Sequence, residues 1–293
     1  MILGRTSDIR TWIFHLIFFY KENIFRKLFP LMAVLTGYTL LIMYLDTTWH
    51  LVAAIIDRGL EQFHIIFSFI LAFFISFRVN TSYGRWWEAR ILWGSLVNTC
   101  RNVALKFDVY VDLNNYPELK QIIAIYPNIL KLHLRKDNKA IAEEFNKYSY
   151  ELLEGDNPMV FLNHKLFVYV NELRKENKIS LEQFLALDQC VAGLMDITGG
   201  CERILNTRPP SAFAFLARQA LLVYALTFPF GWVDTFGVIA IPFLLIIVYV
   251  LFGLEVLAEE MENPFGLDDH DLPIDGIATT VAKNVNAIQR YKI

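Results

Sequence analysis

The densest group of side chains that could bind a ligand is the acidic run NPFGLDDHDLPID at residues 263–275. Asp268, Asp269, His270 and Asp271 follow a Pro/Gly turn, so their oxygen atoms lie on one bent loop. Carboxylate and carbonyl oxygens on such a loop are ligands for calcium. Acids that follow an apolar helix also mark a solvated exit and cap neighbouring helices. Both interpretations stay open on the residues alone.

Catalytic motifs are missing from the rest of the sequence. There is no P-loop, GxSxG, HExxH or dinucleotide fingerprint, and the six histidines are scattered. Cys100, Cys190 and Cys201 have neither CxxC nor metal-ligand spacing, which predicts buried reduced thiols. We therefore expect a protein that is not an enzyme. The alternatives from other classes are a membrane-bound metal enzyme centred on residues 268–271 and a scaffold protein that conducts no ions.

A second candidate site lies on the apolar stretch HIIFSFILAFFISF at residues 64–77. At 100° per residue, one face of this helix mixes phenylalanine with amide and hydroxyl groups: Gln62, Ile66, Phe69, Phe73, Ser76, Phe77 and Asn80. Another face holds only apolar side chains: Phe63, Phe67, Ile70 and Phe74. The mixed face fits a path for water or ions, and it fits an ordinary helix interface nearly as well.

The elements that position these sites are apolar helices. The chain has 293 residues, of which 55% are hydrophobic, and its mean hydropathy is +0.37, which predicts an integral membrane protein. Four apolar stretches are candidates for membrane helices: 28–45, 64–77, 211–233 and 236–254. The last two form a hairpin with a short turn at Asp234 and Thr235, and Arg218 and Gln219 should face protein or water.

Loop charge predicts the orientation. Lys and Arg are concentrated in the N-terminal, central and C-terminal segments, which are therefore expected in the cytoplasm, with an even number of spans in the cell membrane. The N-terminal stretch lacks the pattern of a cleaved signal and is expected to be retained. A net charge of −3 without a basic run excludes nucleic acid as a partner.

The central segment reads as a helical bundle. Apolar residues recur at three-to-four spacing in 89–111, 116–136, 138–155 and 180–205, which predicts amphipathic helices without strands. The expected organisation is an all-α membrane protein whose four transmembrane helices continue into a cytoplasmic bundle. Its predicted parts are a cytoplasmic N-terminal segment (1–27), a first pair of membrane helices (28–77) and the cytoplasmic bundle (78–208). They are followed by a second pair of membrane helices (209–254) and a cytoplasmic C-terminal segment (255–293).

Three segments together resemble the bestrophin family, especially its bacterial branch. They are FRVNTSYGRWWEAR at 77–90, CERILNTRPPSAFAF at 201–215 and EEMENPFGLDDHDLPID at 259–275. The resemblance implies a homopentameric channel with one central pore lined by the second span. It assigns a hydrophobic neck to Phe69, Phe73 and Phe77, beside the polar residues of the same face, and a cytoplasmic aperture to Ile204.

The resemblance also bears on selectivity and calcium. The family contains anion-selective channels and bacterial members that prefer cations; three phenylalanines in the neck favour chloride or other monovalent anions, and sodium is the alternative. Eukaryotic members bind calcium after NPFG, and Asn263, Asp268 and Asp271 match the ligand positions. Leu267 and His270 replace acidic residues of that run, which lowers its charge and weakens the expectation of calcium binding.

Overall fold

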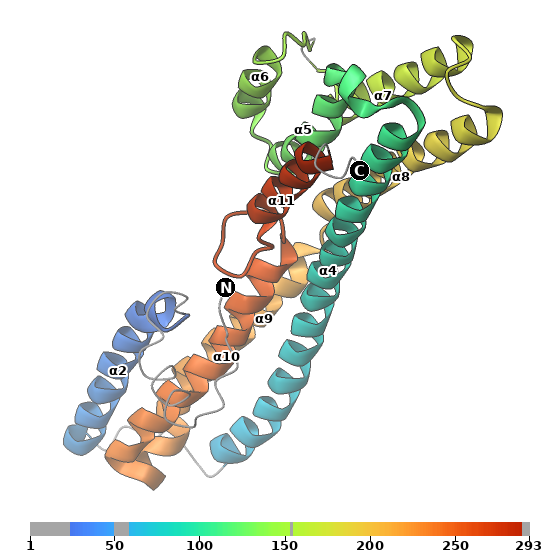
Figure 1. Cartoon of the computed structure of the whole chain (residues 1–293). Coiled ribbons are helices and arrows are strands. Elements are labelled where there is room, and N and C mark those ends of the chain that lie inside the picture. The colour runs from blue at the N-terminus through green and yellow to red at the C-terminus, as the bar shows by residue number, and fades with distance from the viewer. Residues whose placement is uncertain (1–23, 50–58, 153–154, 289–293) are drawn as a thin grey trace, which may run out of the picture. The chain divides into compact units, whose positions relative to one another are not determined.

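The structure is a computed structural model of the whole chain, and it describes residues 24–49, 59–152 and 155–288 (Figure 1). All regular elements in these ranges are helices, so the all-α prediction is confirmed for the described residues. The predicted N-terminal segment 1–27 lies mostly outside them. The chain divides into two compact units, residues 1–83 with 209–261 and residues 84–208 with 262–293.

The first unit holds the most apolar helices. It contains α2 (Ile24–Trp49), the first part of α4 (Gly59–Val111), α9 (Ser211–Phe236) and nearly all of α10 (Ala240–Glu262). Three helical segments of the described chain are long and apolar enough to cross a membrane: 24–48, 59–111 and 211–262, the last comprising α9 and α10. The core of the unit joins all four helices: Leu35, Leu71, Ile75, Leu221, Tyr224, Ala225, Phe228, Leu244 and Val248.

The connection between α9 and α10 lies later than the sequence predicted. The predicted turn was at Asp234 and Thr235, but α9 continues to Phe236 and the chain passes through the 3-10 turn η2 (Gly237–Ile239). Gly237 has a φ of 55°, which glycine adopts at little cost because it lacks a Cβ. The glycine therefore ends the helix, and the polar pair before it remains helical.

Helix α4 is continuous over 53 residues, so the predicted boundary between Phe77 and Arg78 falls inside it. Its sequence contains no proline, and each backbone N–H beyond the first turn has a helical partner to donate to. The expected continuity between the apolar stretch and the following amphipathic helix is confirmed. The residues of α4 therefore include both the candidate pore face and the first residues of the second unit.

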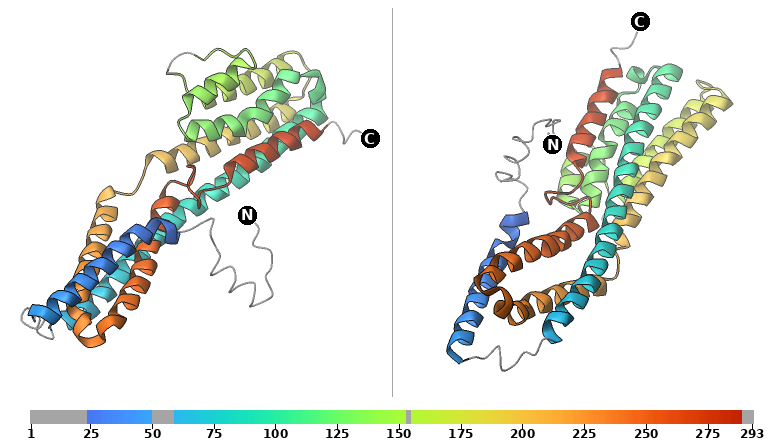
Figure 2. Two further views of the ribbon diagram at one scale, coloured as in Figure 1. Left: turned by 90° about the vertical axis from the view of Figure 1, so that its left-hand side faces the viewer. Right: turned by 90° about the horizontal axis from the view of Figure 1, so that it is seen from below.

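The second unit is a helical bundle with its own core. Beside the later part of α4 it contains η1 (Leu113–Asn115), α5 (Pro117–Leu134), α6 (Asn138–Asn146), α7 (Pro158–Lys175), α8 (Leu181–Asn206) and α11 (Ile274–Ala287). Helices α7 and α8 pack as a pair, and α11 lies along α5 (Figure 2). Trp93, Phe107, Tyr126 and Phe145 are the largest side chains fully buried in this core.

Two helices of this unit were not predicted, and one is shorter than expected. Helix α7 begins where the Asn157 side chain accepts from the backbone N–H of Met159, with Pro158 in the first turn. Asparagine before proline is a strong start signal for a helix, and it was overlooked. Helix α11 was also missed, and α6 ends at Asn146, whereas the pattern predicted a helix to residue 155.

Candidate functional site

The face of α4 that mixes phenylalanine with polar groups is exposed. The exposed fractions of Phe69, Phe73 and Phe77 are 77%, 73% and 57%. The polar members of the face are exposed as well: Gln62, Ser76 and Asn80. A row of bare aromatic rings calls for an apolar partner, whereas amides and hydroxyls at membrane depth face protein or water. The composition therefore suits a surface shared between subunits and a water-filled path.

The opposite side of α4 is a buried stripe. Its members recur at spacings of three, four or seven residues: His64, Leu71, Ile75, Arg78 and Ser82. Leu71 and Ile75 pack in the apolar core, while the polar members make directional bonds. His64 Nε2 lies 2.9 Å from Thr227 Oγ1 on α9, and Arg78 Nε donates to Glu255 Oε2 on α10 at 2.7 Å. In the described part of the first unit, α4 is thus held along this stripe.

Three glutamates near the end of α10 pair with cations from other helices of the unit. Glu255 accepts from Arg78 and lies 3.4 Å from Arg218 Nε. Glu259 pairs with Arg218 at 2.7 Å, and Glu260 pairs with Lys27 of α2. Arg218 is paired with two of these glutamates although 48% of its side chain is exposed, and Gln219 is exposed as well. These glutamates were missed because the predicted fourth span ended at residue 254, one position before the first of them.

An apolar hollow of about 190 Å³ opens beside the last ring of the candidate neck. Side chains of α4 and of the start of α9 line it: Phe74, Phe77, Arg78, Thr81, Ser82, Pro209, Pro210 and Phe213. The Thr81 hydroxyl donates to the Phe77 carbonyl at 2.9 Å, and Arg78 is paired with Glu255. Arg78 and Thr81 of the wall are therefore engaged within the chain, and most of the remaining lining is apolar.

Ile204 is placed differently from the neck residues. Its side chain is only 2% exposed, within the core of the second unit, and its carbonyl accepts a hydrogen bond from Arg85. Arg85 also donates to the carbonyls of Thr207 at 2.7 Å and Glu262 at 3.2 Å. Burial does not favour Ile204 as a pore-lining side chain, and its role at an aperture stays a prediction.

The aromatic-basic segment after the neck is bound to the second unit by its own contacts. The guanidinium of Arg85 donates to the three backbone carbonyls described above, and Glu88 accepts from Arg203. Trp86 Nε1 donates to the His270 carbonyl at 3.1 Å. Arg85 and Trp86 thus bind the ends of α8 and α10 and the acidic loop, whereas Trp87 is half exposed.

The acidic loop is braced by its own hydrogen bonds. Asp271 Oδ2 accepts from the backbone N–H of Asp268 at 2.7 Å, and the Asp268 side chain is exposed. A Cβ added at Gly266 would lie 2.7 Å from Asp271 Oδ2 and 3.4 Å from Asn263 Nδ2, so a larger residue there would require the Asp271 side chain to shift. Asn263 Oδ1 is buried and has no hydrogen-bond partner in the described part of the chain. Asn263 and Asp271 together therefore fit the oxygen-rich start of a calcium site.

The loop does not assemble a wider set of ligating side chains. No group of three or more His, Cys, Asp and Glu side chains suited to a metal ion occurs among the described residues. The alternative of a metal enzyme centred on residues 268–271 therefore has no support in the described arrangement. Calcium would depend on carbonyl and amide oxygens more than on carboxylates.

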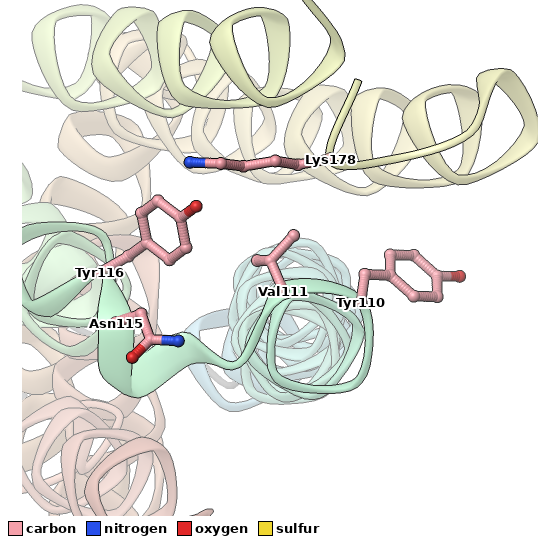
Figure 3. A pocket seen from close by; sticks show the side chains of 5 residues that line it. All are labelled: Tyr110, Val111, Asn115, Tyr116 and Lys178. Atoms are coloured by element: carbon pink, nitrogen blue, oxygen red, sulfur yellow. The ribbon is translucent and has the colours of Figure 1, made fainter. Parts of the chain in front are cut away.

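A second hollow, of about 520 Å³, lies in the second unit beside the C-terminal end of α4 (Figure 3). It is lined by Tyr110, Val111, Asn115, Tyr116 and Lys178. The Lys178 ammonium lies over the Tyr116 ring, 5.4 Å from its centroid, and pairs with Glu176 at 2.7 Å. No residue of the predicted sites lies here, and its one cation is already paired, so we assign it no ligand.

Comparisons with known proteins agree with the three motif segments. The family model described as Bacterial/Fungal Bestrophin protein matches residues 5–287. A voltage-dependent anion channel-forming protein of Synechocystis sp. is 34% identical over 234 residues, 76% of each chain. Its counterpart in Nostoc sp. is 32% identical over 232 residues, covering 76% of this chain and 75% of the relative.

Solved structures agree on the fold. A crystal structure of a bacterial bestrophin homologue from Klebsiella pneumoniae has a TM-score of 0.79 at 21% identity, covering 89% of this chain and 98% of that chain. The match to the family model extends over both compact units and includes all three motifs, from FRVN to the acidic loop. The chain therefore belongs to the bacterial and fungal branch of the bestrophin family.

Proposed function

We propose that this chain forms a homopentameric channel in the cell membrane that conducts monovalent anions, chloride among them. The observation behind the proposal is the exposed face of α4, where Phe69, Phe73 and Phe77 alternate with polar side chains while the opposite stripe is buried. Copies of that face around an axis would enclose a narrow aromatic neck with polar groups beside it. The names of the relatives from Synechocystis and Nostoc support anions. A sodium-selective channel of the same fold is the alternative.

The neck would act as a hydrophobic gate. Phenylalanine rings offer a passing ion no hydrogen bonds, so a tight neck is dry, and conduction requires it to widen and fill with water. Ring edges turned inward favour anions because they are electropositive, whereas ring faces favour cations. In the proposed topology four helices span the membrane, and both termini and the second unit lie in the cytoplasm.

A reversal-potential measurement in planar bilayers tests the function. Under a tenfold salt gradient, the current through an ideally selective pore for singly charged ions reverses at about 59 mV, with opposite signs for anions and cations. We expect the anion sign. The cation sign would select the sodium alternative, and absence of current from purified oligomers under all conditions would favour a scaffold.

The neck assignment is tested by replacing Phe69, Phe73 and Phe77 with alanine together. Removing the rings should lower the dewetting barrier, so we expect a higher open probability and weaker selectivity between ions of different size. The control is F25A/F29A on α2, which removes two half-exposed rings from the same unit but off the α4 face. Unchanged gating and selectivity in the neck variant would contradict the assignment.

We also propose weak calcium binding at the acidic loop, with Asn263, Asp268 and Asp271 as ligands beside backbone carbonyls. The support is that Asn263 Oδ1 is buried without a hydrogen-bond partner, and that the Asn263 side chain and the Asp271 carboxylate both lie beside Gly266. Titration of the purified protein with calcium in a calorimeter tests it. D271N keeps an oxygen for the Asp268 N–H but removes the charge, and should abolish the binding heat. D269N alters an exposed neighbour and should keep it; equal heats in both variants would contradict the site.

A further inference from the structure

The orientation of α4 about its own axis decides what faces the proposed pore. Successive residues of a helix differ by about 100°, so a modest rotation exchanges the Phe69, Phe73 and Phe77 face for its neighbour. The apolar part of the buried stripe, Leu71 and Ile75, resists such a rotation weakly, because hydrophobic contacts have little directionality. Directional bonds are needed to hold a single orientation.

One such bond lies immediately after the last ring of the neck. Arg78 Nε donates to Glu255 Oε2 at 2.7 Å, and both side chains are buried, at 6% and 5% exposure. Because the pair lies in an apolar segment, either charge alone would be costly, so the two groups remain together. Glu255 Oε1 lies 3.4 Å from Arg218 Nε of α9, so the carboxylate also contacts a third helix.

A second directional bond lies on the other side of the neck rings. His64 Nε2 lies 2.9 Å from Thr227 Oγ1, and Nδ1 lies 3.0 Å from the Leu60 carbonyl. A Cβ added at Gly231 would lie 2.8 Å from His64 Nδ1, so the imidazole occupies space that only a glycine leaves open. The neck segment therefore lies between two polar contacts, one to α9 and one to α10.

We propose that Glu255 is a positioning residue of the channel: by holding Arg78 it fixes the rotation of α4, and with it the three neck rings. Glu255 itself is buried and lies away from the exposed face, so it acts through Arg78 and not through contact with ions. The inference rests on the proposed channel function. The contact between His64 and Thr227 holds α4 before the neck rings, and the contact between Arg78 and Glu255 holds it after them.

The test compares E255Q with E259Q in planar bilayers, with native mass spectrometry to count subunits. E255Q keeps the shape of the side chain but removes the charge that holds Arg78. We expect at least a threefold change in open probability in oligomers of normal mass. E259Q is the matched control four residues later: its side chain is 57% exposed, and Arg218 keeps Glu255 as a partner. It should gate like the wild type.

The double variant R78Q/E255Q covers the case in which E255Q does not assemble. It leaves no lone charge in the core, and buried ion pairs replaced as a pair are often tolerated. It should assemble and still show the altered open probability, because two amides hold the helix less firmly. Wild-type gating in the double variant, while the neck triple variant is altered, would overturn the positioning role. A wild-type oligomer without conductance would instead overturn the proposed function.

Discussion

At the scale of single residues, Ile204 lies in a motif that identifies the family, but the motif alone does not determine the role of its side chain. The motif CERIL lies on α8 as expected, but Ile204 is buried and its carbonyl accepts from Arg85. The family resemblance assigns this residue to an aperture, whereas its burial assigns it to the core. The two roles predict different outcomes for one substitution.

We expect I204A to lower stability and to leave selectivity unchanged. Truncating a fully buried isoleucine costs about 2–5 kcal/mol through lost contacts and the cavity left behind. Thermal denaturation of the detergent-solubilised protein and the reversal potential are the two measurements. A matched control is L205A, whose side chain is only partly buried and packs against the same core. A variant of normal stability with altered conductance would restore Ile204 to the aperture.

The Asp275 carboxylate predicts a pH dependence. Its contacts with Arg135, at 2.8 and 3.2 Å, and with Lys131 lower its pKa from 3.8 to about 2. Because the folded-state pKa is depressed, the stabilisation is fully present above pH 3.8 and is lost as the pH falls towards 2. The side chain is 59% exposed, so solvent screening reduces the contribution to about 1 kcal/mol.

We therefore expect D275N to lower the Tm at pH 7 and to flatten its dependence on pH between 4 and 2. Melting curves of the wild type and the variant across this range are the measurement. D269N, in the exposed part of the preceding loop, is the control and should follow the wild type. Parallel curves for all three proteins would rule out this contribution.

At the scale of elements, close approach between helices sets where α4 and α9 can meet. His64 of α4 is 1% exposed, and its ring lies against Gly231 of α9, with Tyr224 edge-on at 5.4 Å between centroids. A larger residue at this position would push the ring away from Thr227. The glycine in TFPFGWV is thus required by packing, since α9 is helical there and needs no special φ.

We expect G231A to destabilise the first unit by about 1–3 kcal/mol, because the added Cβ would overlap His64 Nδ1 in a packed site. G37A on α2 is the matched control: nothing lies within 4 Å of its added Cβ, and alanine is the better helix former. Thermal denaturation should show a lower Tm for G231A and an equal or higher Tm for G37A. Equal Tm values for the two variants would contradict the prediction, because they would mean that α4 and α9 can move apart at Gly231 without loss of stability.

The ends of α8 and α10 depend on one side chain for their closing hydrogen bonds. Arg85 donates to the carbonyls of Ile204, Thr207 and Glu262, which belong to the last turns or the cap of these helices. The last carbonyls of a helix have no partner within it and lie at the negative end of its dipole, so a cation is favoured there. The guanidinium of Arg85 therefore lies where the helix ends favour a positive charge.

At the scale of the whole molecule, family membership and the exposed face of α4 both favour a channel built from several copies of the chain. The chain belongs to a family of channels and is not an enzyme, as the missing catalytic motifs predicted. A single chain leaves three phenylalanines of α4 bare, and a closed ring of identical subunits would cover them with copies of the same face. In such a ring, this face of α4 would surround the proposed pore.

We expect native mass spectrometry to give an assembly of about 170 kDa, five times the 34.0 kDa chain. The neck triple variant F69A/F73A/F77A should retain this mass, so that an effect on gating can be separated from an effect on assembly. F25A/F29A provides the same comparison away from the α4 face. A monomer in mild detergent and in lipid nanodiscs would contradict the pentamer.

The sequence by itself determined the features that depend on local pattern. The length of the apolar stretches indicated membrane helices, the 100° period separated two faces of α4, and three ordered motifs identified the family, whose resemblance favoured one of these faces. Each of these signals lies within a short segment or in the order of segments. The helix start at Asn157–Pro158 is a local signal too, and it was simply missed.

Only the tertiary structure decided which distant residues meet. Arg78 and Glu255 are 177 positions apart, and nothing in either neighbourhood names the other as its partner. The same holds for Arg85 and the helix ends, for His64 and Gly231, and for the burial of Ile204. The physical reason is that a helix presents several faces, and the one that becomes buried depends on which other helices pack against it.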